Sequence, residues 1–226
     1  MPINYFSSIR QPSPLQIDRA AFSANLILLL GYIFALWFQI YDFNKRAREA
    51  VAISVYFLGF ALLVVSAIIE LSVDIVSART VGHGRYHSHS PVWNRIISLF
   101  FIAAMILDIV SFSYWILRKF DIEDIVLVCS AYILLIMATL AVFFQIKERI
   151  VDTPDTIEFF SNSMVFLNAI LGVVLRHLEL SEKDLDNLTN GMELSLVIVF
   201  LISTVLYILA DLLRLKSGGG NVGVQS

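Results

Sequence analysis

The chain has 226 residues, of which 58% are hydrophobic and 15% are charged, whereas an ordinary soluble domain has roughly 45–50% and about 25%. Because so apolar a chain cannot cover a water-exposed surface with polar groups, its composition favours a lipid bilayer over a soluble fold. The net charge of -3 argues against a nucleic-acid partner, and the single cysteine, Cys129, excludes an internal disulfide and a thiolate metal cluster.

The first 19 residues are predicted to form a polar N-terminal segment, because they lack the basic start and short apolar core of a secretory signal. Crossing a bilayer requires about 20 mostly apolar residues. Six segments meet this requirement: residues 20–41, 50–71, 96–117, 125–146, 157–175 and 194–213. Their apolar runs do not alternate with polar residues as barrel strands do. The predicted fold is therefore all-α, a polytopic transmembrane helical bundle of six spans over residues 20–216, followed by a flexible tail over residues 217–226.

The fifth segment is the weakest of the six, because Ser161, Asn162, Ser163 and Asn168 lower its apolar content. A five-span arrangement is the alternative, and it would place the two termini on opposite sides of the membrane. With six spans, nine Lys and Arg residues flank the spans on the side of the termini and seven on the other side. Because cytoplasmic loops are enriched in positive charge, we expect an integral membrane protein with both termini in the cytosol. The glycosylation sequon that begins at Asn187 then falls in an outer loop, which agrees.

Polar and small residues recur at helical spacing along four of the six segments. The residues that share a helix face are Gly59, Ser66, Glu70 and Asp74 in the second segment, Ser98, Asp108, Ser111 and Trp115 in the third, Ser161, Asn168, Gly172 and Arg176 in the fifth, and Thr204, Tyr207 and Asp211 in the sixth. Polar groups in lipid usually face the interior of a bundle. The faces predict a compact bundle with a polar interior, which serves either as packing seams or as a pathway for a solute.

Three polar residues are predicted near the middle of the membrane. Asp108, Asn168 and Thr204 each lie about ten to twelve residues into their segments, or roughly 17–18 Å deep for the first two at a rise of 1.5 Å per residue. An isolated carboxylate at that depth costs several kcal/mol. We therefore expect Asp108 either to share a hydrogen bond with Asn168 or to hold a proton or a cation.

A second acidic group is predicted at the end of the bundle that carries the termini. It consists of Glu70, Asp74 and Asp211, with Arg214 near enough in sequence to neutralise part of its charge. Carboxylates at a membrane interface are commonly solvated, and that is one interpretation of this group. The other is a vestibule that attracts cations.

Three of the four histidines, His83, His87 and His89, lie within seven residues between the second and third segments. Neutral imidazoles are common zinc ligands, so these residues are candidates for a metal site. The spacing is not a strong motif, because the neighbouring glycines and a proline disfavour a helix that would hold the rings together. A solvated, basic and pH-sensitive loop is the alternative interpretation.

No sequence motif of a known catalytic class is present: G-x-S-x-G, H-E-x-x-H and a phosphate-binding glycine loop are all missing. We therefore expect no cofactor and favour a non-catalytic membrane component or accessory subunit. Its partners would be the bilayer and either other membrane subunits or a second copy of the chain. A small solute or ion transporter using a mid-membrane carboxylate is the alternative. A metal-dependent membrane enzyme using the histidine loop is a third and weaker interpretation.

Overall fold

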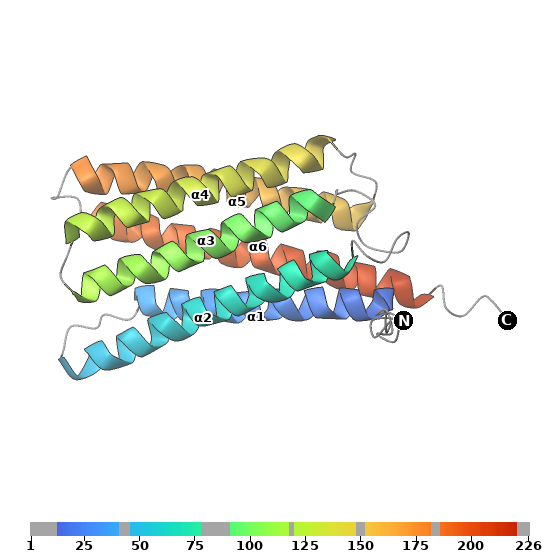
Figure 1. The fold of residues 1–226 in the computed structure, drawn as a ribbon, viewed down its shortest axis with the longest axis horizontal. Coiled ribbons are helices and arrows are strands. Elements are labelled where there is room, and N and C mark those ends of the chain that lie inside the picture. The colour runs from blue at the N-terminus through green and yellow to red at the C-terminus, as the bar shows by residue number, and fades with distance from the viewer. Residues whose placement is uncertain are drawn as a thin grey trace, which may run out of the picture.

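The computed structural model describes residues 13–40, 46–77, 91–117, 120–147, 152–181 and 186–220, and all of its regular structure is helical. The six helices are α1 (Pro14–Ile40), α2 (Arg46–Ser77), α3 (Pro91–Ile116), α4 (Phe120–Lys147), α5 (Thr153–Ser181) and α6 (Asp186–Gly220). They lie alongside one another as one bundle (Figure 1). The predicted all-α bundle is therefore confirmed.

Two helix starts follow directly from local sequence. Before α1, the Ser13 hydroxyl accepts from the Gln16 amide at 3.4 Å, while the Gln16 side chain accepts from the Ser13 amide at 2.9 Å. This reciprocal capping box, with Pro14 as the first helical residue, satisfies donors that a helix start leaves unpaired. Before α5, the Asp152 carboxylate accepts from the Asp155 amide at 2.9 Å, which is an ordinary N-cap.

The helices extend beyond the apolar segments that predict them. α1 begins at Pro14 instead of residue 20, so part of the expected N-terminal segment is helical. α6 continues to Gly220, four residues into the expected tail over residues 217–226. Caps and backbone hydrogen bonds set where a helix ends, whereas apolar content marks only the part that suits hydrocarbon.

The backbones of the six helices form a closed ring. Within the described residues, each helix packs along two neighbours only: α1 on α2, α2 on α3, α3 on α4, α4 on α5, α5 on α6, and α6 on α1. Successive helices run in opposite directions, so the start of α1 and the end of α6 lie at the same end of the bundle (Figure 1). We call this end the terminal end and the opposite one the far end. No helix of the described part occupies the middle of the ring.

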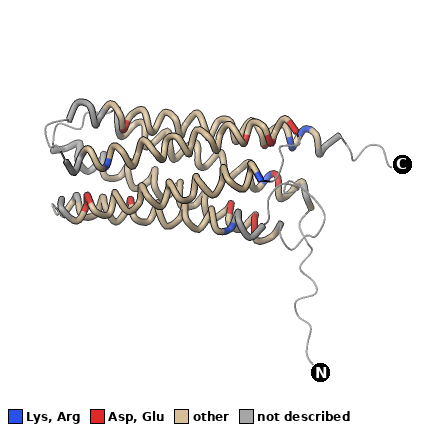
Figure 2. The backbone as a smooth tube through the Cα atoms, turned by 90° about the horizontal axis from the view of Figure 1, so that it is seen from above, with Lys and Arg blue, Asp and Glu red and all other residues tan. Residues whose placement is uncertain are grey.

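The bundle is apolar outside and polar inside. Large side chains that face outward include Leu99, Ile125, Phe143 and Phe160, each more than half exposed, whereas Ser66, Ser161, Asn168, Thr204 and Asp211 are at most 2% exposed. Figure 2 shows the charged residues toward the two ends, with an uncharged stretch between them. So large an apolar surface would be unstable in water and is suited to lipid.

All six described helices are long and apolar enough to span a membrane, including the fifth, whose candidate span is Thr153–Leu178. The six-span prediction is therefore confirmed over the five-span alternative, and the chain has the character of a multi-pass integral membrane protein.

Halfway along the bundle, apolar side chains fill the ring. This central layer consists of Tyr32, Leu63, Ala104 and Met105, all buried, with Phe101 and Phe200 packed against them. The Tyr32 and Phe200 rings are stacked at 5.2 Å between centroids and 3° from parallel. The layer draws side chains from α1, α2, α3, α4 and α6, since Ile133 and Leu134 of α4 also pack against it, and it divides the interior of the ring into a terminal half and a far half.

Candidate functional site

A cavity of about 240 Å³ lies in the terminal half of the ring. All six helices contribute side chains to its wall, so it lies on the common axis of the bundle. Its charged lining residues are Glu70 and Asp74 from α2, Glu158 from α5 and Arg214 from α6. Two of the predicted acidic residues, Glu70 and Asp74, therefore face this cavity.

The cavity is polar toward the terminal end and apolar at its inner end. On α6 its wall runs from Arg214 to Phe200, a distance of roughly 21 Å at 1.5 Å per residue. Tyr32, Phe101 and Phe200 line the inner end and also belong to the central layer. The cavity therefore reaches from the charged end of the bundle to about its middle, where aromatic side chains close it.

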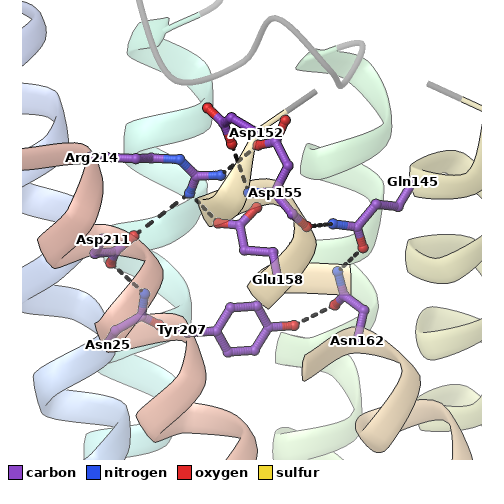
Figure 3. Close-up of polar contacts among 9 residues, drawn as sticks. All are labelled: Asn25, Gln145, Asp152, Asp155, Glu158, Asn162, Tyr207, Asp211 and Arg214. Carbon is purple, nitrogen blue, oxygen red and sulfur yellow. Dashed lines mark hydrogen bonds and ion pairs between the residues drawn. The ribbon is translucent and has the colours of Figure 1, made fainter. Parts of the chain in front are cut away.

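An ion-pair cluster stands on the α5–α6 side of the cavity (Figure 3). The Arg214 guanidinium donates to the Asp155 carboxylate at 3.0 Å and to the Glu158 carboxylate, and it lies 3.9 Å from the Asp211 carboxylate. The Arg214 side chain is only 11% exposed and that of Asp211 1%. A planar guanidinium can bind several carboxylates at once, so it holds α5 and α6 together.

Asp211 joins this cluster to α1. Its carboxylate accepts a buried hydrogen bond of 2.8 Å from the Asn25 amide, and Figure 3 shows it between Asn25 and Arg214. Asp211 is not among the residues that line the cavity. The predicted acidic group is thus divided: Glu70 and Asp74 face the cavity, while Asp211 stabilises the contact that closes the ring.

A chain of amide and phenol groups connects α4, α5 and α6. The Tyr207 hydroxyl donates to the Asn162 carbonyl oxygen, and the Asn162 amide donates to the Gln145 carbonyl oxygen at 2.7 Å. Gln145 in turn donates to the backbone carbonyl of Asp155 at 3.4 Å. Each polar side chain is matched to a partner on another helix, which is how buried polar groups avoid a desolvation penalty.

Hydroxyl groups complete the polar part of the wall. The Ser98 hydroxyl of α3 donates to the Asp74 carboxylate at 3.2 Å, and the Ser66 hydroxyl of α2 donates to the Ala24 carbonyl of α1 at 2.8 Å. Thr204, predicted near the middle of the membrane, lines the cavity and donates to the Phe200 carbonyl at 2.8 Å.

Asp108 does not line the cavity. It lies on α3 seven residues beyond Phe101 toward the far end, beside the Ser130 hydroxyl, and it interacts electrostatically with Arg176. Tyr56 donates to its backbone carbonyl at 3.2 Å. On α3 the central-layer residues Ala104 and Met105 lie between the cavity-lining Phe101 and Asp108.

The hydrogen bond with Asn168, one of the two options expected for Asp108, does not form. The Asn168 amide donates to the Leu196 carbonyl of α6 at 3.0 Å, and its carbonyl oxygen has no hydrogen-bond partner among the described residues. The physical reason is the ring: the α5 backbone packs along α4 and α6, and the Asn168 amide turns to its neighbour α6. Equal depth in the membrane does not make two residues neighbours.

The far half of the ring holds an aromatic group and an ion pair. Tyr56 stacks on Phe112 with 3.6 Å between ring centroids, and Phe38 packs edge-on against both. Arg176 forms a 3.0 Å ion pair with Glu193. The cavity described above lies on the other side of the central layer, in the terminal half.

The predicted metal site lies outside the described residues, because His83, His87 and His89 fall between α2 and α3. Within the part of the chain that the structure describes, no group of three or more metal-binding side chains comes together.

The spacing of polar residues does not single out Asn25, Gln145 or Glu158 as members of the site. The sequence does carry a signal for Asn25, because an amide side chain inside an apolar span destabilises the fold unless it forms a hydrogen bond. The partners themselves could not be predicted, since they depend on which helices are adjacent in the ring.

In comparisons with known proteins, no protein-family model, no curated protein and no solved structure matches the chain.

Proposed function

We propose that the protein carries a small polar solute or ion across its membrane and binds it in the cavity of the terminal half. The observation that supports this most directly is the cavity itself, which lies on the axis of a closed ring and takes its wall from all six helices. Seams that serve packing alone are filled at close to crystal density. A hollow with charged and polar groups in its wall, at the centre of a membrane bundle, suits a transported polar solute.

The one-sided shape favours a carrier over an open pore. The central layer, with its stacked Tyr32 and Phe200 rings, closes the inner end of the cavity. A solute bound there has access to one side only, and its passage requires the central layer to move. In this proposal Asp108, which lies beyond that layer on α3, would be the next carboxylate that a transported cation meets.

A second candidate is the accessory membrane component, in which the polar interior only holds the helices together. The central layer favours it, because its stacked Tyr32 and Phe200 rings interrupt the interior of the ring. In that case the cavity would be a static hollow.

A flux assay separates the two. The full chain is reconstituted into liposomes, and stopped-flow light scattering and potential-sensitive dyes follow the entry of glycerol, urea, Na⁺, K⁺ and n-butylammonium. At least one probe should enter faster than it enters protein-free liposomes. Ala141→Phe, which places a ring in the cavity from α4, should abolish that entry. The matched control Ala61→Phe changes an exposed alanine of α2 and should leave it intact.

Protein-free rates for all five probes would contradict the carrier and favour the accessory component. Equal flux in wild type and Ala141→Phe would show that the solute passes elsewhere.

A further inference from the structure

We infer that the cavity is a binding site for a small organic cation that carries N–H groups, of the protonated-amine class, with Glu70 and Asp74 receiving its charge. The inference rests on the proposed function where it takes this cation to be the transported solute. The binding site itself can be tested separately.

The charge of the wall favours a cation. Among the described residues that line the cavity, three are carboxylates and one is a guanidinium. That guanidinium, of Arg214, already contacts the carboxylates of Asp155 and Glu158 on the α5–α6 side. Glu70 and Asp74 stand on the α2 side, one helical turn apart, so both carboxylates can approach a single ligand.

The hydroxyl groups of the wall are arranged to accept hydrogen bonds. A hydroxyl has one hydrogen to donate and two acceptor lone pairs. Ser66 donates its hydrogen to Ala24, Thr204 to Phe200 and Tyr207 to Asn162.

Ser98 likewise donates to Asp74, and Ser203 bonds within the pair that it forms with Ser161. What these groups offer a ligand is therefore acceptor oxygen. A ligand rich in donors fits these hydroxyl groups.

Size and the inner wall point to an organic cation in preference to a bare metal ion. The cavity of about 240 Å³ equals about eight water molecules at roughly 30 Å³ each, so one dehydrated ion would leave most of it to water. Tyr32, Phe101, Phe144 and Phe200 give the inner end apolar and aromatic surface. Such surface suits a short alkyl chain, and aromatic faces also attract ammonium groups.

The test measures binding to the full chain purified in detergent by isothermal titration calorimetry. The decisive probes are n-butylammonium and tetramethylammonium, which share atomic composition and charge but differ in having three N–H bonds and none. n-Butylammonium should bind at least ~10-fold more tightly, because only it can donate to the acceptor wall. Na⁺ at the same concentration should not displace it.

Two variants assign the charge-binding residues. Asp74→Asn and Glu70→Gln should each weaken n-butylammonium binding by about 10-fold or more, in line with the loss of one charge-assisted hydrogen bond. The matched control Asp124→Asn removes a carboxylate of α4 at the far end, outside the cavity, and should bind like wild type. Glu70 is half-buried, so Glu70→Gln remains informative even where the buried Asp74 variant fails to fold.

Equal binding of the two ammonium ions, displacement by Na⁺, or unchanged affinity in both variants would overturn the inference. The outcomes also separate it from the proposed function. Amine binding without flux of any probe would retain the site and reject the carrier. Flux of glycerol or urea without amine binding would retain the carrier and reject this ligand class.

Discussion

Tyr207 shows how much one hydroxyl can hold together in this bundle. It donates to Asn162, which donates to Gln145, so the chain of bonds joins α6, α5 and α4. Tyr207→Phe keeps the ring and leaves the Asn162 carbonyl oxygen without that donor. We expect the free energy of unfolding to fall by about 1–3 kcal/mol, the cost of an unsatisfied buried acceptor.

Urea unfolding in mixed micelles, followed by tryptophan fluorescence, measures this loss. Tyr132→Phe is the matched control, because the Tyr132 hydroxyl also makes one side-chain bond, to His177 at 2.9 Å, but on an exposed side chain. Its stability should change by less than about 0.5 kcal/mol. Equal losses in the two variants would mean that the buried chain of bonds is not stabilising.

Arg214 carries a larger share of the stability. Replacing it with Met leaves the carboxylates of Asp155, Glu158 and Asp211 without the guanidinium that they contact. Breaking a buried ion pair by removing one partner costs about 3–5 kcal/mol. Arg214→Met should therefore unfold far more readily in the same urea titration, whereas Lys216→Met, an exposed change two residues on, should not. Near-wild-type stability of Arg214→Met would show that these carboxylates are solvated.

For single residues, the sequence predicted which side chains are buried better than it predicted their hydrogen-bond partners. Helical spacing correctly turns Ser66, Asn168 and Asp211 inward, because their faces recur at the helix period. It failed for the partner of Asn168, which bonds to Leu196 on α6. Spacing along one helix fixes a direction around that helix, but a partner also depends on which helix stands opposite.

Among the elements, α1 and α2 approach each other closely at two glycines, Gly31 and Gly59. A Cβ atom added to Gly31 would lie 2.6 Å from the Leu63 Cδ2 atom and 3.1 Å from the Gly59 carbonyl oxygen. A Cβ atom added to Gly59 would lie 3.2 Å from the Phe34 Cβ atom. Small residues at a helix contact allow this approach in membranes, where dispersion between helices provides much of the attraction.

Gly31→Ala should therefore lower the free energy of unfolding by about 1–3 kcal/mol, the usual cost of overpacking. Gly191→Ala is the matched control in α6, where nothing lies within 4 Å of the added atom. There the better helix propensity of alanine should raise stability by up to about 1 kcal/mol. Both changes are measured in the same unfolding assay. A stabilised Gly31→Ala variant would show that Leu63 moves aside freely.

Two glycines that the sequence analysis placed on polar helix faces, Gly59 and Gly172, differ in their surroundings. Gly59 belongs to the predicted polar face of α2 and lies at a close contact, whereas Gly172 of the α5 face has its nearest neighbour atom at 4.0 Å. The presence and number of the helices could be predicted, because a run of about 20 apolar residues indicates a membrane-spanning helix. The start of α1 was also encoded, in Ser13 and Gln16, but apolar content does not register a capping box.

For the whole molecule, the even number of spans makes a prediction about its ends. With six spans both termini lie on one side, and the balance of Lys and Arg favours the cytosol. An epitope tag at each end should be cut by protease together in vesicles whose cytosolic face is outward, and both should survive in vesicles of the opposite orientation. One cut and one protected tag would contradict the six-span topology.

The ring itself was beyond the reach of the sequence. Six similar antiparallel helices can pack as a row, as two layers or as a ring, and their apolar content is the same in each case. What selects the ring are contacts between distant segments, such as the Asn25–Asp211 hydrogen bond that links α1 to α6. The cavity exists because of that closure, so it too could not be predicted from spacing within single helices.

Closure of α1 onto α6 also means that the chain could begin at a different helix and keep the same cyclic order. A short linker between the ends of α6 and α1, combined with a cut between α2 and α3, would retain all six pairs of adjacent helices. Both new ends would emerge on the original side. A circular permutant of this kind should therefore assemble the same barrel of helices, which a linear row, with its two unjoined edges, could not do.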